Sequence, residues 1–130
     1  MEVIKGNEKI FKHFISGEIN ATGERFSDVY DPAKGEVIGR VPMAGRDTVE
    51  RAISSAEKAL PNWSNQTPLR RARVMFRFRD LLERHADELA ALITQEHGKV
   101  LSDARGEVTR GIEVVEFACG IPHLQKGEFS

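Results

Sequence analysis

The chain has 130 residues, of which 30% are charged and 40% hydrophobic, and its formal net charge is −1. Those proportions suit one folded domain and exclude a disordered chain. A nearly neutral chain creates no broad field for nucleic acid or an anionic membrane, so we expect neither partner. Cys119 is the only cysteine, which excludes an intrachain disulfide and favours a cytoplasmic location.

The two ends of the chain carry different information. The segment Met1–Phe14 mixes charged residues with isolated apolar ones, unlike a signal or transit peptide, and no stretch reaches the roughly 20 apolar residues that cross a bilayer. We therefore expect a soluble protein. At the other end the chain reaches Ser130 without a cap or closing element, so we expect it to be the beginning of something longer.

The first part of the sequence is typical of a small antiparallel β meander of three or four strands. Apolar residues alternate with polar ones on both sides of a turn at Ser16–Glu18. The segment Asp31–Gly35 has the chemistry of a turn, with Asp to accept from the backbone, Pro to preset φ and Gly where φ becomes positive. Pro42 should end the last strand because it cannot donate to a ladder. The expected strands lie at about 11–19, 25–30 and 36–41.

From Asp47 onward the apolar residues recur with helical period. Asp47 begins a capping-box pattern, and Pro61 should stop the first helix. The second helix should begin after Thr67 as N-cap and end at Gly98, with a break near Arg84–Ala86 because it exceeds the usual ~8 to 20 residues. Strands followed by helices fit an α+β fold or the start of an α/β domain. The three expected helices lie at about 47–60, 68–97 and 102–119.

The second predicted helix holds the strongest charge run, six arginines that could bind phosphate groups. Acidic residues are interspersed among them, and Asp80 and Arg84 have the i, i+4 spacing of an ion pair. We therefore favour a solvated, ion-paired surface. The arginines are Arg70, Arg71, Arg73, Arg77, Arg79 and Arg84.

We expect no catalytic role for two groups of residues whose side chains are chemically reactive. Glu96, His97 and Lys99 offer an acid, an imidazole and an amine, but adjacent helical residues point in different directions, and Gly98 among them is an ordinary helix end. Cys119 continues the apolar stripe of its helix and has no neighbouring base, so we expect a buried thiol and no nucleophile. We expect no catalytic residue in this chain.

Metal and nucleotide motifs are missing from the sequence. The histidines are scattered singly and neither C-x-x-C nor H-E-x-x-H occurs, so we expect no metal site. Glycine-rich loops of the G-x-G-x-x-G and G-x-x-x-x-G-K types are absent as well, so no cofactor-binding residue is expected.

Arg110 is the remaining candidate for a binding residue. It shares one face of the third predicted helix with Gly106, Val114 and Phe117. A guanidinium on a partly apolar face, with a glycine leaving room beside it, could bind a carboxylate through two parallel hydrogen bonds. The alternative is an internal ion pair with a glutamate three residues to either side, and the residues alone favour that alternative.

Several motifs resemble those of aldehyde dehydrogenases. The segment Asp31–Pro42, D-P-A-K-G-E-V-I-G-R-V-P, resembles N-P-A-T-G-E-V-I-G-x-V-P, and Glu96–Lys99 resembles E-T-G-K. Trp63 and the segment Arg70–Ala72 stand where that superfamily has W and R-A. The resemblance runs from about Phe11 to the last residue but reaches only the beginning of the family's chain. It implies the amino-terminal portion of the NAD-binding region of an α/β fold, without the catalytic domain.

The segment Gly106–Gly120 narrows the resemblance to one subfamily. It is similar to the G-E-V-x-R-G-I-E-x-V-E-F-A motif of methylmalonate-semialdehyde dehydrogenases, which aldehyde dehydrogenases in general do not carry. In that family the arginine at the position of Arg110 helps to bind the substrate's carboxylate, which reverses our preference for the ion pair. The departures from the family motifs are Asp31 for Asn, Lys34 for Thr, and His97 for Thr or Asn.

The resemblance implies an oxidoreductase that converts malonate or methylmalonate semialdehyde to acetyl-CoA or propanoyl-CoA with release of CO2, in valine and inositol catabolism. NAD and CoA would serve the whole enzyme, usually a homotetramer in this family. The family's nucleophilic cysteine and nucleotide-binding strands lie beyond this segment, so we expect the chain alone to bind neither cofactor and to be inactive. Two alternatives stay open: a stand-alone binding or assembly module, and another aldehyde dehydrogenase subfamily.

Overall fold

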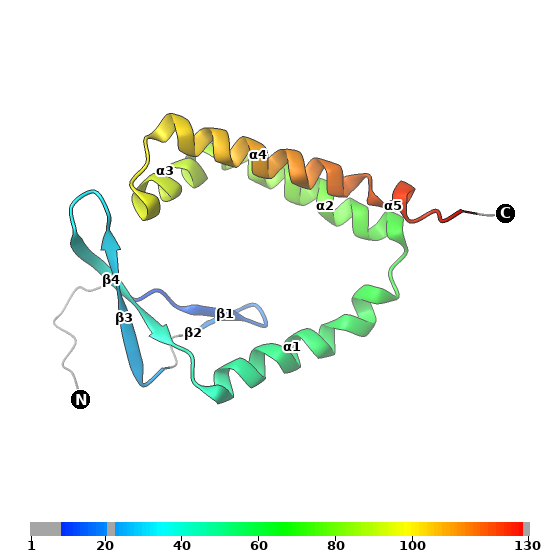
Figure 1. The fold of residues 1–130 in the computed structure, drawn as a ribbon. Coiled ribbons are helices and arrows are strands. Elements are labelled where there is room, and N and C mark those ends of the chain that lie inside the picture. Colours follow the sequence, from blue (N-terminus) through cyan, green and yellow to red (C-terminus); the bar gives the residue numbers. More distant parts are fainter. Residues whose placement is uncertain (1–8, 21–22, 129–130) are drawn as a thin grey trace. The chain divides into compact units, whose positions relative to one another are not determined.

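The computed structural model describes residues 9–20 and 23–128 (Figure 1). These residues form two compact units that divide between Pro61 and Asn62. The first unit contains the strands and most of the first helix, and the second contains the remaining helices.

A short hairpin opens the first unit. Strand β1 (His13–Ile15) pairs antiparallel with β2 (Glu18–Asn20), and His13 lies opposite Asn20. Ser16 and Gly17 between them both have positive φ, as a two-residue type I′ turn requires. The predicted turn at this place is confirmed.

A second hairpin follows, between β3 (Arg25–Asp31) and β4 (Glu36–Met43). The Asp31 carboxylate accepts from the Ala33 backbone N–H at 2.9 Å, and the Asp31 carbonyl accepts from the Gly35 N–H at 2.7 Å. Gly35 has φ 72. Asp and Gly therefore play the parts that the sequence predicted for them in this turn.

The prediction that Pro42 ends its strand is wrong, because β4 continues to Met43 with Pro42 opposite Phe26. The backbone N–H of Arg40 points away from β3, since it donates to the Lys9 carbonyl at 2.9 Å. Residues two apart in a strand have the same orientation, so the missing N–H of Pro42 also lies on the side away from β3. The β3–β4 ladder loses no hydrogen bond.

The strands also do not form one continuous meander. Within the described residues they make two separate two-stranded sheets, and a bridge from Ile10 to Arg40 runs along the outer edge of β4. A Cβ atom on Gly39 would lie 2.5 Å from the Lys9 carbonyl oxygen and 2.7 Å from the Phe11 ring. Only glycine permits this close approach of the two segments.

Helix α1 (Arg46–Ser64) differs from the prediction at both ends. It begins at Arg46, so Asp47 lies inside the first turn and not at the N-cap. At its other end it continues one turn beyond Pro61. The lost hydrogen bond falls on the carbonyl of Glu57, an exposed residue where water can replace the donor, so proline is tolerated this close to the helix end.

In its described residues, the second unit contains the end of α1 and four further helices: α2 (Pro68–Arg84), α3 (Ala86–His97), α4 (Leu101–Cys119) and the one-turn α5 (Ile121–Leu124). The Thr67 hydroxyl accepts from the Arg70 N–H at 3.3 Å, which confirms the predicted N-cap of α2. The predicted long helix is divided at His85, whose φ of −108 and ψ of 17 leave the helical region. Three expected helices therefore become four and a single turn.

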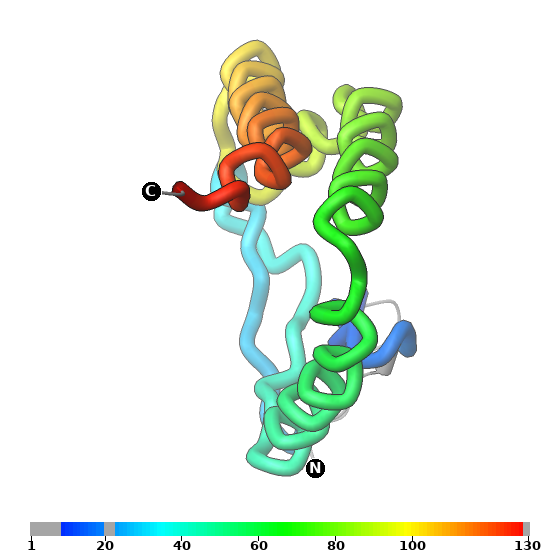
Figure 2. The backbone as a smooth tube through the Cα atoms, turned by 90° about the vertical axis from the view of Figure 1, so that its right-hand side faces the viewer, coloured from blue at the N-terminus to red at the C-terminus, as the bar shows by residue number. Residues whose placement is uncertain are grey.

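Small side chains set how closely these helices pack. α4 runs alongside α2 and α3 (Figures 1 and 2). Ala90 of α3 and Ala104 of α4 are both 0% exposed, and with Val108 they form the core, against which Leu89 packs. Alanine at such positions lets two backbones approach closely while excluding water. The result fixes which face of α4 is turned inward.

The link between α3 and α4 is a left-handed helix end. Gly98 has φ 82, and its N–H donates to the Thr94 carbonyl at 2.8 Å. α4 begins at Leu101, so only three residues separate the two helices. The predicted stop at Gly98 is confirmed, and the turn places Lys99 beside the first turns of α4.

Gly98→Ala should lower the free energy of unfolding of the chain by about 1 kcal/mol or more, because alanine is strained at φ 82. Gly111→Ala is the matched control, because residue 111 is at an exposed position of α4 where an added Cβ would meet nothing within 4 Å. This substitution should leave the stability unchanged or raise it by up to ~1 kcal/mol. Urea denaturation followed by helical circular dichroism measures both. Equal effects of the two substitutions would contradict the role of Gly98.

Candidate functional site

Arg110 lies on the face of α4 opposite the core. Val108 and Ala104 are buried against α3, whereas Arg110 is exposed and Val114 and Phe117 are each 68% exposed. These last two follow Arg110 at the i+4 and i+7 positions and continue its face. The predicted arrangement of an arginine with two apolar neighbours is present on an open surface.

Gly106 provides the space in which the Arg110 side chain lies. The Nη1 atom of Arg110 is 3.4 Å from the position that a Cβ of residue 106 would occupy. The guanidinium therefore folds back by one turn, toward the beginning of α4, as long helical side chains tend to do. A larger residue at position 106 would have to share this space with the guanidinium.

Glu107 is the carboxylate nearest to this site along α4, and it is already bound by another cation. The Lys99 ammonium donates to the Glu107 carboxylate across the α3–α4 turn. This hydrogen bond holds the pKa of Glu107 below its ordinary value, and the charges of Arg110 and His97 act in the same direction, against partial burial, which raises it. Glu107 thus lies in a positively charged environment.

Arg110 itself is not engaged by a carboxylate in the part of the chain that the structure describes. Among the described residues, its guanidinium forms no ion pair or hydrogen bond with Glu107 or Glu113, the two glutamates three residues away. Its parallel N–H donors are therefore available to a planar anion. An exposed arginine with apolar neighbours and a nearby second cation is suited to a small carboxylate with a short carbon chain.

The other candidate residues are placed apart from any reactive arrangement. Glu96 and His97 are exposed at the end of α3, and Lys99 is turned toward Glu107. Cys119 is 8% exposed on the inner side of α4, as its position in the apolar stripe predicts. The structure brings none of these groups together as an acid, a base and a nucleophile.

The arginine run of α2 includes ion pairs, as its acidic neighbours suggest. Arg79 binds Glu83 at 2.5 Å and reaches across to Glu116 of α4 at 2.9 Å. The hydrogen bond with Glu116 is the main reason why the pKa of Arg79 is raised. This arginine therefore ties α2 to α4 and does not serve as a phosphate ligand.

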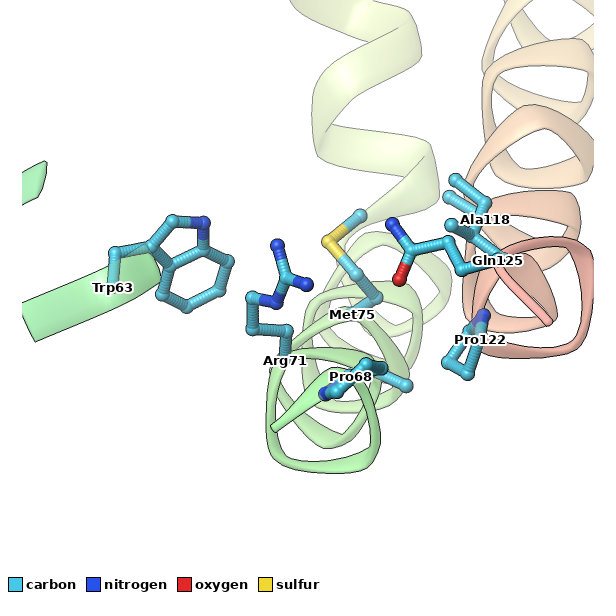
Figure 3. Close-up of a pocket in the computed structure, with 9 residues that line it drawn as sticks. Trp63, Pro68, Arg71, Met75, Ala118, Pro122 and Gln125 are labelled. Carbon is cyan, nitrogen blue, oxygen red and sulfur yellow. The ribbon is translucent and has the colours of Figure 1, made fainter. Parts of the chain in front are cut away.

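An apolar pocket of about 280 Å³ lies in the second unit, between the beginning of α2 and the end of α4 (Figure 3). Figure 3 shows Arg71 between Trp63 and Met75, with Pro122 and Gln125 beyond. Arg71 is its one charged residue. Such pockets bind small molecules when several polar groups converge on them, and this one lacks that convergence.

Within residues 9–20 and 23–128, no group of three or more histidine, cysteine, aspartate or glutamate side chains could hold a metal ion. No helix in the same residues is long and apolar enough to cross a membrane.

Comparison with known proteins decides the family. The sequence model of the aldehyde dehydrogenase family matches residues 19–130, most of the chain. This chain belongs to the aldehyde dehydrogenase family. The resemblance drawn from the Asp31–Pro42 and Gly106–Gly120 segments is confirmed.

Its relatives in this family narrow the resemblance. Malonate-semialdehyde dehydrogenase of Pseudomonas aeruginosa is 48% identical over 118 residues, which are 91% of this chain and 24% of that protein. The chain thus spans about a quarter of the length of the curated relatives that it matches.

Solved structures of aldehyde dehydrogenases confirm the fold. The methylmalonate-semialdehyde dehydrogenase of Oceanimonas doudoroffii is 52% identical, with a TM-score of 0.89 over 92% of this chain and 24% of its own. A Sinorhizobium meliloti protein assigned to the same enzymes and solved with NAD is 43% identical, with a TM-score of 0.90 over 97% of this chain and 26% of its own. The expected α/β aldehyde dehydrogenase-like fold is therefore correct.

The sequence does not predict the place of Lys99 beside the candidate site. Its sequence neighbours Glu96 and His97 suggest an acid–base group, whereas its contact is with Glu107, eight residues on. The available signal was Gly98, because a left-handed helix end followed by a new helix turns the next residue back toward that helix.

Glu107→Gln should lower stability at neutral pH and cease to matter in acid. The folded-state pKa lies below the ordinary 4.5, so the ionised carboxylate stabilises the fold fully above pH 4.5, and this contribution is lost as pH falls through the folded pKa. Urea denaturation of chain and variant, from neutral pH to about pH 3, measures the convergence. Glu113→Gln, on the same helix, is the control and should show none. A Glu107 difference that persisted in acid would contradict this assignment.

Proposed function

We propose that this chain supplies the amino-terminal part of a dehydrogenase for malonate or methylmalonate semialdehyde, in which Arg110 binds the carboxylate of the substrate. The observation that carries the proposal is the Arg110 guanidinium, exposed, placed over Gly106 and without a carboxylate partner in the described residues. Support comes from relatives whose names specify an aldehyde that carries such a carboxylate.

The chemistry of the aldehyde would belong to the remainder of the enzyme. In the proposed reaction a cysteine thiolate adds to the aldehyde carbon, hydride passes from that carbon to NAD, and the resulting thioester loses CO2 and is transferred to CoA. The one cysteine of this chain, Cys119, is buried and continues the packed face of α4. It is therefore unsuited to the role of nucleophile, and no step of the reaction is assigned to it.

The contribution of Arg110 would be to orient the substrate. A bidentate pair between a guanidinium and a carboxylate fixes the direction of a short molecule as well as its position. Val114 and Phe117 lie on the same face and can contact the carbon chain between carboxylate and aldehyde. Such binding would discriminate a semialdehyde acid from an uncharged aldehyde of similar length.

Exposed apolar side chains support the proposal that this segment works inside a larger protein. Val49, Ile53 and Leu60 form the apolar stripe of α1, and each is exposed. Phe76 of α2 is also 53% exposed. Large apolar residues on several helices are typical of surfaces that another part of a protein covers.

Arg110→Ala should raise KM for malonate semialdehyde about 10- to 100-fold and leave KM for propanal nearly unchanged, because only the first substrate has a carboxylate to lose. The suitable protein is a chimeric enzyme, in which this chain is joined to the remaining three quarters of the Oceanimonas doudoroffii dehydrogenase. Arg105→Ala, also on α4, is the control and should change neither value. An equal rise for both aldehydes would show that Arg110 does not recognise the carboxylate.

The 130-residue chain alone should produce no NADH from malonate semialdehyde, NAD and CoA, because its single cysteine is buried. The chimeric enzyme, assayed in parallel by absorbance, should produce NADH. Activity in the isolated chain would overturn the assignment of the chemistry to the remainder, and an inactive but folded chimeric enzyme would count against the proposed family role.

A further inference from the structure

Arg110 has two potential partners on its own helix, and neither is bound to it in the described residues. Glu107 precedes it by three positions and Glu113 follows it by three, a spacing at which arginine and glutamate commonly pair. A substrate carboxylate would have to compete with such a pair. The geometry around Glu107 shows what prevents one of them from forming.

Lys99 holds Glu107 from the turn between α3 and α4. Its side chain is only 19% exposed, and the left-handed turn at Gly98 places its ammonium at the Glu107 carboxylate. If this partly buried ammonium lost its partner, it would still bear the free-energy cost of partial removal from water, and no ion pair would offset that cost. Glu107 should therefore pair with Lys99 in preference to the exposed Arg110.

Gly106 gives the Arg110 guanidinium space against the backbone of α4. Because Arg110 Nη1 lies 3.4 Å from the missing Cβ, the guanidinium can rest directly over the helix backbone, one turn before its own Cα. This position is next to Glu107, whose ionisation Arg110 favours without forming an ion pair. Lys99, Glu107 and Arg110 together therefore carry one net positive charge at the surface.

We propose that Lys99 is a positioning residue for Arg110: by holding Glu107, it leaves the guanidinium unpaired over Gly106 and available to the substrate carboxylate. The inference rests on the proposed function for the identity of the anion. The exchange of partners between Lys99, Glu107 and Arg110 can be tested without any substrate.

The first experiment measures the pKa of Glu107 in the 130-residue chain by carbon-13 NMR. In Lys99→Met, Arg110 should move to Glu107 and keep the pKa of Glu107 below its ordinary value. In the double variant Lys99→Met with Arg110→Ala, the pKa of Glu107 should be higher than in the single variant, because both cations that lower it most are gone. Lys99→Arg keeps a cation in place and should behave as the wild type. Equal pKa values in the single and double variants would show that Arg110 does not replace Lys99, and would overturn the inference.

The second experiment uses the chimeric enzyme. Lys99→Met should raise KM for malonate semialdehyde roughly five- to tenfold, with kcat and the KM for propanal little changed, and adding Glu107→Gln should restore KM to within about twofold. Lys58→Met, an exposed lysine of α1, is the matched control. Failure of Glu107→Gln to rescue would overturn the inference.

Glu107→Gln alone separates positioning by Lys99 from positioning by Glu107 itself, and it does not depend on the folding of the Lys99 variant. It should leave KM for malonate semialdehyde unchanged, because the arginine never needed that carboxylate. A rise in KM would contradict the inference. If Arg110→Ala lost no selectivity while the NMR exchange occurred as expected, the proposed function would fail and the arrangement of partners would stand.

Discussion

The packing of α4 against α3, with Ala90 and Ala104 in the core, determines which face of α4 is buried and which is open to solvent. Both alanines are completely buried, and larger apolar residues such as Leu89 and Ile112 pack around them. The inner face of α4 must then be apolar, because a charged side chain there would lose its contact with water. Arg110, on the other side of the same helix, is directed outward by this packing, and the site depends on it.

Local signals in the sequence were sufficient where the physical cause is local. The Asp31–Gly35 turn, the Thr67 cap and the Gly98 helix end are each decided by side-chain and backbone chemistry within a few residues. The prediction for Pro42 is wrong for the opposite reason. Whether Pro42 interrupts a ladder depends on which edge of β4 it faces, and that edge is defined by pairing with residues about thirty positions earlier.

The site divides in the same way. Helical spacing alone put Arg110, Val114 and Phe117 on one face, so this part was predictable from periodicity. Periodicity could not decide between a free guanidinium and one paired with a glutamate. The residue that we propose to decide it, Lys99, lies outside α4, in the turn that precedes it, and binds Glu107 from there. Family resemblance pointed to the first option, and the geometry supplies a physical reason for it.

Pro42 also affects whether the edge of β4 can pair with a strand of another molecule. The outer edge of β4 is a row of backbone groups that could pair with a strand of another molecule and start aggregation. The segment around Ile10 occupies part of that edge through hydrogen bonds to Arg40, and at the next outward position proline has no N–H to offer. Pro42 is moreover fully buried, so at this position the edge of β4 offers a strand of another molecule neither an N–H nor an accessible surface.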